Sequence, residues 1–363
     1  MISQIIAMMR RRIMSRGVAS SILILASMVI AATAPAQLGT SKSNDEFRDI
    51  VESVDGSRIM STVTDLQDFG SRAFDSQSMW NASIYIHDRF AELGLWVTYQ
   101  EFEVQGYPQR NVVAVLNGTD PAAPQYLFGA HYDSITMDIL LGTGLDYAPG
   151  ADDDASGVAA TIELATALHD MEFNSTVKFV AFGAEETGLN GSFTFVGREL
   201  ENGTLYADTA IMDMIGYRVA SQNRAFIFRG SSDNTLSASI HDAVYRYGLN
   251  LSLTFISGTE FAYSDHYAFW VAGYPSLMVI EELEDDWPAN PHYHTENDTV
   301  DHISQEQMEV VTKAILGGFL DLQGSPKKNS DDSGALFLVI TVVIVITAVA
   351  VTVYVYRNRK DVT

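Results

Sequence analysis

Strand-like apolar runs alternate with helical segments along most of the chain, and this alternation is the feature that most constrains the fold. The expected strands are residues 96–104, 111–116, 125–128, 176–182, 209–212, 225–228, 251–256 and 276–280. The expected helices are residues 45–68, 76–93, 155–168, 235–247, 265–271 and 305–320. Strands that alternate with helices form a mostly parallel sheet that helices cover on both faces. The sequence therefore predicts an α/β fold.

Charge and composition exclude several classes of protein. The 363 residues carry 22 Lys and Arg against 46 Asp and Glu, a net charge of −24, and so negative a surface repels nucleic acid. The surplus of acids fits a saline habitat, with ordinary variation in surface charge as the alternative. The chain has no cysteine, which excludes disulfides, thiolate zinc sites and cysteine nucleophiles. Histidine and carboxylate side chains remain as possible metal ligands.

The two ends of the chain predict membrane-directed segments. Four arginines between residues 10 and 16 precede an uncharged apolar run at 22–32, and small residues follow with the spacing of a signal-peptidase site. We therefore expect residues 1–36 to be a signal peptide, with an uncleaved N-terminal anchor as the alternative. Residues 334–356 contain no charged residue. As a helix rising about 1.5 Å per residue, they are long enough to cross a hydrocarbon layer of about 30 Å.

The segments beside this second apolar run predict how the chain is oriented. Basic residues in 357–363 predict a short cytoplasmic tail, which puts the domain of residues 37–322 outside the cell. Residues 323–333 are polar, contain Gly, Pro and Ser, and are typical of a stalk. The sequence thus predicts a single-pass protein of the cell membrane, with an extracellular domain and the lipid bilayer as a partner.

Side chains suited to metal chemistry follow two of the expected strands and begin one of the expected helices. His131 and Asp133 come directly after an apolar run, and such a pair suits a metal ligand whose ring a carboxylate orients. Three consecutive acids, residues 152–154, begin an apolar helix. They repel one another unless a cation is present, although a solvated loop with an Asp cap is the alternative. Glu185 and Glu186 can divide their roles, one binding metal while the other transfers a proton.

Two further residues complete this set. Asp213 lies within an apolar run, and burial of an unpaired carboxylate is costly enough to require a partner. His294 lies in a polar loop after the last expected strand. Open α/β sheets assemble sites at the carboxyl ends of their strands, where several of these residues are expected. Two histidines and three carboxylates satisfy a pair of zinc ions if one carboxylate bridges them.

The order of these motifs resembles the di-zinc aminopeptidase family of metallopeptidases. This family includes bacterial leucyl aminopeptidases, glutamate carboxypeptidases, glutaminyl cyclases and the non-catalytic transferrin receptor. The matching motifs lie at 131–133, 150–157, 185–192, 213, 264–266 and 294–299. The similarity spans roughly residues 66–320. It implies a three-layer α/β/α zinc-peptidase fold with a mostly parallel central sheet.

The resemblance also implies a set of ligands for two zinc ions. His131 and Asp213 would hold one ion, and Glu186 and His294 would hold the other. Asp153, the middle acid of its triplet, would bridge them.

Catalytic roles follow from the same resemblance. Glu185 would be the general acid/base toward a water activated by the two zinc ions, and Asp133 would orient His131. The peptide bond between Asp153 and Asp154 is expected to be cis.

The chain also departs from its relatives. The bacterial leucyl enzymes carry a tyrosine three residues before Ser-Asp-His that helps to stabilise the tetrahedral intermediate, and Phe261 takes that place here. Tyr263 is the candidate replacement. We expect Asp265 and His266 to act as a helix cap and as hydrogen-bonding groups beneath the site.

The scarcity of basic residues bears on the substrate. Glutamate carboxypeptidases of this family hold carboxylates with arginines, and here Arg198 and Arg218 are the few basic residues near the motifs. The resemblance therefore favours an aminopeptidase that removes apolar or varied N-terminal residues from peptides. The alternatives are a carboxypeptidase or dipeptidase, a glutaminyl cyclase with one zinc, and a non-catalytic binding protein displayed on the membrane.

Overall fold

A computed structural model describes residues 42–137, 147–230, 234–258, 262–284, 287–323 and 327–328. The chain divides into two compact units, residues 1–45 and 46–363. Of the first unit only 42–45 are described, as the start of helix α3 (Lys42–Glu52). The expected signal peptide, membrane span and cytoplasmic tail lie outside the described residues. Within the described ranges, no helix has the length and hydropathy needed to cross a membrane.

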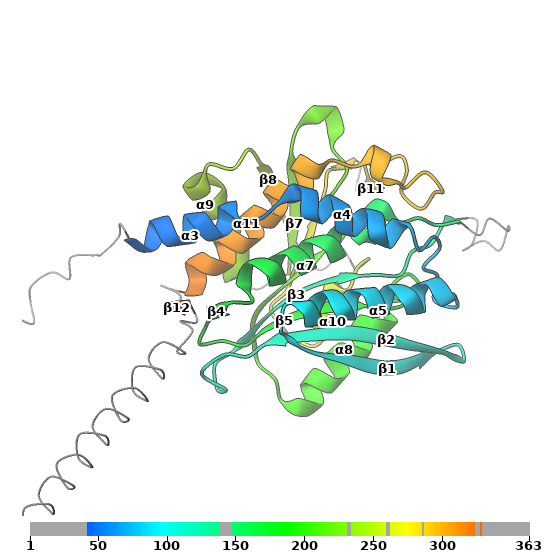
Figure 1. The fold of residues 1–363 in the computed structure, drawn as a ribbon, viewed down its shortest axis with the longest axis horizontal. Helices are drawn as coiled ribbons and strands as arrows, with labels where there is room; N and C mark the ends of the chain where they lie inside the picture. The colour runs from blue at the N-terminus through cyan, green and yellow to red at the C-terminus, as the bar shows by residue number, and fades with distance from the viewer. Residues whose placement is uncertain are drawn as a thin grey trace, which may run out of the picture. The chain divides into compact units, whose positions relative to one another are not determined.

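The second unit is built on an eight-stranded sheet with the order β1-β2-β5-β3-β6-β9-β7-β8 (Figure 1). The strands are β1 (Trp96–Val104), β2 (Tyr107–Leu116), β3 (Gln125–His131), β5 (Val177–Phe182), β6 (Tyr206–Met212), β7 (Arg224–Arg229), β8 (Ser252–Ser257) and β9 (Leu277–Ile280). Four of the seven pairings are parallel, and the antiparallel ones are β1 with β2, β2 with β5 and β7 with β9. The predicted α/β fold with a mostly parallel sheet is confirmed.

Helices pack on both faces of this sheet. They are α4 (Gly56–Gln67), α5 (Gln77–Glu92), α7 (Gly157–Leu168), α8 (Asn190–Asn202), α9 (Thr235–Tyr247), α10 (His266–Val271) and α11 (Gln305–Gln323). Successive residues of a strand point to opposite faces. Accordingly, Phe179 of β5 belongs to the large core beneath α4, α5, α7, α9 and α11, whereas its neighbour Val180 packs in a smaller core with residues of α8 and α10. The result is three layers, α/β/α.

The candidate site residues lie at the carboxyl ends of the central strands. β3 ends at His131, and Glu185 and Asp213 follow closely after β5 and β6. The segment from Ala151 to Ser156 leads into α7, and within it Asp153 and Asp154 have non-helical backbone angles. α7 is apolar around almost its whole surface because α4 and α11 cover the side that faces away from the sheet. The acid triplet, residues 152–154, therefore lies at the edge of the sheet where β3, β5 and β6 end.

Three elements differ from the sequence prediction. The single helix expected at 45–68 is two helices, because Asp55 takes an extended conformation and its side chain caps α4 through the backbone N–H of Ser57. α8 was not predicted. The chain also continues α11 to Gln323 and then pairs β12 (Lys327–Lys328) with β4 (Met171–Glu172). The other residues of the expected stalk lie outside the described ranges.

Candidate active site

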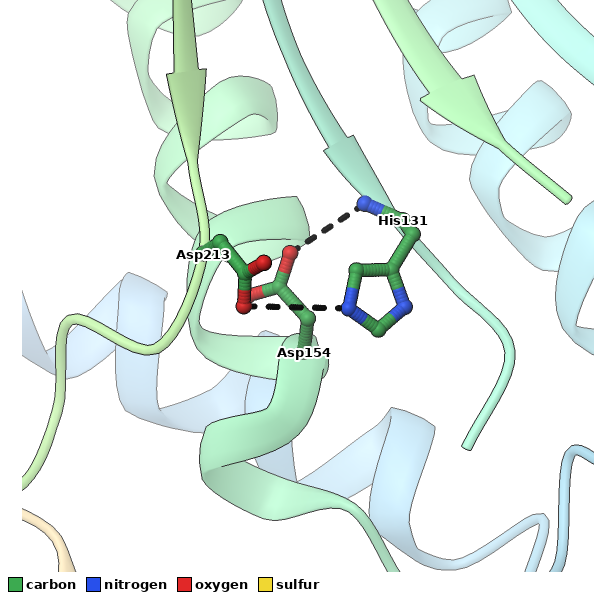
Figure 2. Close-up of side chains that lie close together, drawn as sticks. All are labelled: His131, Asp154 and Asp213. Atoms are coloured by element: carbon green, nitrogen blue, oxygen red, sulfur yellow. Dashed lines mark hydrogen bonds and ion pairs between the residues drawn. The ribbon is translucent and has the colours of Figure 1, made fainter. Parts of the chain in front are cut away.

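His131 anchors one half of the site at the end of β3. Its Nε2 atom lies 3.1 Å from Oδ1 of Asp153 and 3.7 Å from Oδ1 of Asp213. Its backbone N–H donates to Oδ2 of Asp154, 3.1 Å away, and Figure 2 shows Asp154, from the segment before α7, and Asp213, from the end of β6, on the same side of this histidine. All four side chains are buried. The ligand atoms of His131, Asp154 and Asp213 lie within 4.8 Å of one another, close enough to share an ion.

His294 forms the other half of the site. Its Nε2 atom lies 3.0 Å from Oδ2 of Asp153 and 3.1 Å from Oε2 of Glu186. The two carboxylate oxygens of Asp153 therefore face two different histidines, which is the geometry expected of a bridging ligand. Imidazole and carboxylate are ligands that zinc accepts. The donor set, with two histidines and a bridging acid, fits the predicted metal pair.

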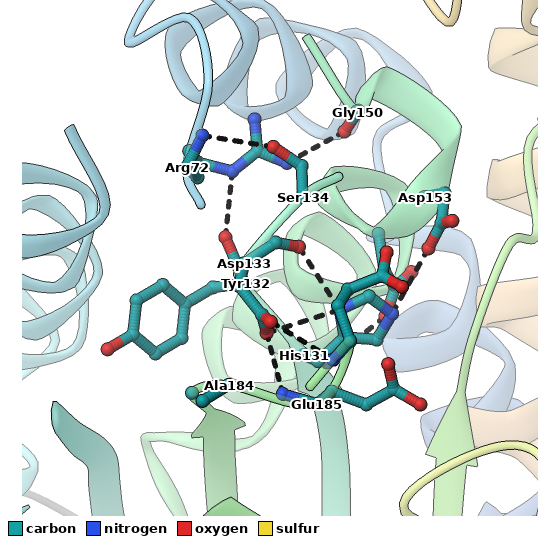
Figure 3. A network of polar contacts seen from close by, with 12 residues as sticks. Arg72, His131, Tyr132, Asp133, Ser134, Gly150, Asp153, Ala184 and Glu185 are labelled. Carbon is teal, nitrogen blue, oxygen red and sulfur yellow. Dashed lines mark hydrogen bonds and ion pairs between the residues drawn. The ribbon is translucent and has the colours of Figure 1, made fainter. Parts of the chain in front are cut away.

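Asp133 holds the two adjacent glutamates in place. Its carboxylate accepts the backbone N–H groups of Glu185 and Glu186, at 3.0 and 3.1 Å. Nδ1 of His131 lies 3.1 Å from the backbone carbonyl of Asp133 but 3.6 Å from its carboxylate, which is too long for a hydrogen bond. Figure 3 shows Asp133 between the histidine and Glu185. Asp133 thus orients His131 mainly through its backbone and positions the glutamates through its side chain.

Glu185 and Glu186 both have raised pKa values. Burial raises the pKa of Glu185 well above its ordinary value; the nearby His131 opposes this rise and the charge of Glu186 adds to it. Burial, reinforced by the charge of Asp153, raises the pKa of Glu186 to about 7. Although burial alone would lower it, hydrogen bonds with Asp153 and Glu186 raise the pKa of His294 to about 10. A carboxylate such as Glu185, with a high affinity for protons, is suited to act as a general base.

Arg72 ties the ligand loops together. It is completely buried, yet it forms no ion pair within the described residues. Its guanidinium donates to the backbone carbonyls of Leu66, Tyr132, Pro149 and Gly150, at 2.6 to 3.1 Å. Figure 3 shows the contacts with Tyr132 and Gly150. It thereby joins the loop after His131 to the loop that carries the acid triplet.

The acid triplet is held by Asp298. The carboxylate of Asp298 accepts the backbone N–H groups of Asp152 and Asp153, at 2.8 and 3.0 Å. The peptide bond between Asp153 and Asp154 is cis, as the resemblance implied. Because Asp298 lies four residues after His294, this contact links two of the loops that carry ligand residues.

A cavity of about 600 Å³ opens beside these residues. Its polar end is lined by His131, Asp153, Glu185, Glu186 and Asp213. The rest of its lining is mostly apolar and includes a wall of Met214, Phe228, Ile256, Met278, Ile280, Leu283 and Pro288. No Lys or Arg lines it among the described residues. Arg198 instead donates to the backbone of Glu101, and Arg218 pairs with Glu306 at 2.8 Å.

Tyr293 is a residue of this cavity that the sequence argument missed. It lines the cavity, and its ring stacks on the ring of His294 with centroids 3.9 Å apart. Burial raises its pKa strongly, and the charges of Asp153 and Glu186 add to the rise, so the phenol remains a hydrogen-bond donor. The only signal in the sequence is an aromatic residue directly before the histidine.

The residues around α10 match their expected roles only in part. Tyr263 lines the rim of the cavity with 75% of its surface exposed, whereas Phe261 lies outside the described residues. Asp265 and His266 are completely buried. The expected helix cap is wrong, because Asp265 already has helical backbone angles and its side chain bonds no amide of α10. His266 instead packs edge-on against Trp270, with centroids 4.4 Å apart.

Comparisons with known proteins agree with this geometry. A model of Peptidase family M28 matches residues 111–318. The chain is 30% identical over 258 residues to the uncharacterized protein YfbL of Escherichia coli K12, covering 64% of this chain and 77% of YfbL. It is 29% identical over 214 residues to aminopeptidase YwaD of Bacillus subtilis 168, covering 57% of this chain and only 44% of YwaD.

A solved structure gives the same result. LapB from Legionella pneumophila aligns with a TM-score of 0.68 at 26% identity, and the alignment covers 77% of this chain and 75% of LapB. The M28 match spans more than half of the chain and contains every predicted metal ligand. The chain therefore belongs to peptidase family M28 and is a zinc metallopeptidase, which confirms the family resemblance of its motifs.

Proposed function

We propose that this protein is a di-zinc aminopeptidase, anchored in the cell membrane with its peptidase domain facing outward. The observation that carries the activity is a cavity whose acidic end adjoins an apolar wall and lacks any Lys or Arg among the described residues. A carboxypeptidase needs a cation to hold the substrate's terminal carboxylate. A free N-terminal ammonium group, by contrast, is attracted to an acidic site, and an apolar side chain fits the wall beside it.

The proposed ligands divide between two zinc ions. His131 and Asp213 hold one, Glu186 and His294 hold the other, and Asp153 bridges them. The support is geometric, since the two oxygens of Asp153 each lie within 3.1 Å of a different histidine. When bound, zinc lowers the pKa of water and polarises the peptide carbonyl.

The chain's own residues then carry the proton and position the reacting groups. Glu185 takes a proton from the attacking water and returns it to the amine that leaves, in keeping with its raised pKa. Asp133 holds the backbone N–H groups of Glu185 and Glu186 and so fixes the base beside a ligand. Tyr293 donates to the oxygen that gains charge in the tetrahedral intermediate, the role for which Tyr263 was the candidate. The partly buried position of Tyr293 against His294 favours it over the exposed Tyr263.

The membrane part of the proposal rests on sequence. The apolar run of 334–356 and the basic residues that follow support a C-terminal anchor with the peptidase domain outside the cell. The substrates would then be peptides in the surrounding medium. Protease protection of a C-terminal tag in intact cells tests this orientation, and a tag that is cleaved from outside would refute it.

Paired substrates test the activity. We expect the purified full-length chain to hydrolyse Leu-p-nitroanilide and to spare N-acetyl-Leu-p-nitroanilide, with two zinc ions per chain by elemental analysis. Equal turnover of both would refute an aminopeptidase. Release of C-terminal residues from N-blocked peptides would indicate a carboxypeptidase. One zinc ion with cyclisation of N-terminal glutamine would indicate a glutaminyl cyclase, and no metal with no turnover would indicate a binding protein.

A further inference from the structure

Three buried acids lie behind the proposed ligands and are not themselves ligands. Asp152 and Glu281 are completely buried, and Asp298 is 2% exposed. In the part of the chain that the structure describes, no Lys or Arg forms an ion pair with any of them. Unpaired charges in such an environment are costly, so the way in which these acids are satisfied needs an explanation.

Asp152 connects three loops that carry proposed ligands. It directly precedes the bridging Asp153. Its Oδ1 atom accepts the backbone N–H of Gly216 at 2.8 Å, in the loop after Asp213. Its Oδ2 atom accepts the side-chain amide of Asn290 at 2.7 Å, in the loop that leads to His294. A single carboxylate therefore sets the spacing between three loops of the metal centre.

Glu281 completes the bonding of Asp152. It directly follows β9, its backbone N–H donates to the carbonyl of Met214 at 2.8 Å, and its Oε2 atom accepts the backbone N–H of Tyr217. Gly216 and Tyr217 are consecutive residues, and their backbone N–H groups bind Asp152 and Glu281 respectively, so the two carboxyl groups lie side by side. A side-chain hydrogen bond between them raises the pKa of Glu281 and opposes the rise that burial causes in the pKa of Asp152. Oε1 of Glu281 accepts no hydrogen bond from any described residue.

The contact between the two carboxyl groups requires a proton. Asp152 already accepts two hydrogen bonds, which favours its ionised form, whereas Oε1 of Glu281 is without a donor. The proton therefore belongs on the carboxyl group of Glu281. Burial raises the pKa of Glu281 well above its ordinary value, and the charge of Asp152 raises it further.

We propose that Glu281 is a positioning residue of the metal centre, which as a neutral acid donates a hydrogen bond to Asp152 and so fixes the loop of Asp153. The inference rests on the proposed ligands. It gives Glu281 a second role, because Ile280 and Leu283 on either side of it line the apolar wall. Glu281 thus joins the wall that would hold the substrate side chain to the loop that would hold the metals.

Variants that separate length, charge and hydrogen bonding test this role. Glu281→Gln keeps the length and a donor, whereas Glu281→Asp keeps the acid but is too short to span the gap, and Glu281→Leu removes all polar atoms. The control is Glu282→Leu, because Glu282 is the next residue in the chain and pairs with Arg224 at 2.6 Å. Zinc affinity is measured on each purified full-length variant by competition with a chromophoric chelator.

We expect Glu281→Gln and Glu282→Leu to bind zinc within about threefold of the wild type. Glu281→Asp and Glu281→Leu should bind it 10- to 100-fold more weakly, as for other groups that support metal ligands. If Glu281→Leu does not fold, the comparison of Gln with Asp still decides. Weak binding by Glu281→Gln with normal binding by Glu281→Asp would mean that Glu281 acts as a charge, and would overturn the proposal. Normal binding by Glu281→Asp and Glu281→Leu would also overturn it.

Zinc affinity distinguishes a failure of this inference from a failure of the proposed function. If no aminoacyl substrate is cleaved but the order of affinities holds, the positioning role stands and the aminopeptidase proposal fails. If Leu-p-nitroanilide is cleaved but the order does not hold, Glu281 has no such role.

Discussion

Removal of zinc should make the stability of this protein fall as the pH rises, because the metal-free site holds its protons tightly. Burial, reinforced by the charge of Asp153, raises the pKa of Glu186 from 4.5 to about 7 in the folded chain. The folded state therefore binds this proton more tightly than the unfolded state does. The resulting stability is fully present below pH 4.5 and is lost as the pH rises toward 7.

The size of this loss follows from the same two values. Each pKa unit corresponds to about 1.4 kcal/mol, so a change from 4.5 to about 7 corresponds to about 3 kcal/mol for Glu186. In a domain of this size such a loss lowers Tm by roughly 6–12 °C. Glu185 and His294 have raised pKa values and change stability in the same direction. The lowered pKa of Asp153 acts in the opposite direction, but only below pH 4.

Thermal unfolding of the metal-free protein between pH 4.5 and pH 8 measures this effect. The matched control is Glu186→Gln, whose slope over the same range should be shallower by the amount assigned to Glu186. The zinc-loaded protein should behave in the opposite way, because metal binding requires deprotonated ligands. A metal-free Tm that is constant or rises over this range would refute the reasoning, as would an unchanged slope in Glu186→Gln.

Two substitutions test the proposed catalytic groups. Glu185→Gln should lower kcat by about 10²- to 10⁴-fold while two zinc ions remain bound, and a nearly normal kcat would remove Glu185 from the role of base. Tyr293→Phe should lower kcat by about 10²- to 10³-fold with little change in KM, because the lost hydrogen bond forms mainly in the transition state. The matched control is Tyr263→Phe, and a larger effect in that variant would assign the donor role to Tyr263.

Much of the fold was predictable because local sequence determined it. The edge strand β1 and the helix α9 were predicted with their observed bounds. The central strands β3, β5 and β6 are largely apolar runs, and their ends placed His131, Glu185 and Asp213 at one edge of the sheet. α8 was missed because it contains Gly, Asn and Thr, and because the residue before it, Leu189, has a left-handed conformation and provides no side-chain cap. Its Phe195 and Val196 pack in the smaller core, so tertiary contacts rather than propensity stabilise this helix.

The groups that support the site were less predictable than the proposed ligands. Asp298 accepts the N–H groups of Asp152 and Asp153, about 145 residues away in the chain. Among the described residues, the guanidinium of Arg72 hydrogen-bonds only to backbone carbonyls. Every residue carries such a carbonyl, so no pattern of side chains identifies these partners. The role proposed for Glu281 requires that it carry a proton, and only its contacts in the folded chain indicate where that proton lies.

The acids behind the site are held mainly by backbone amides, and this has a consequence for the chemistry. Asp133, Asp154 and Asp298 each accept two or more backbone N–H groups rather than pairing with a Lys or Arg side chain within the described residues. Amide dipoles satisfy a carboxylate without adding a full positive charge. A Lys or Arg at these positions would instead repel a divalent cation and compete for Asp153 and Glu186. The same absence of full positive charge leaves the cavity favourable to an N-terminal ammonium group.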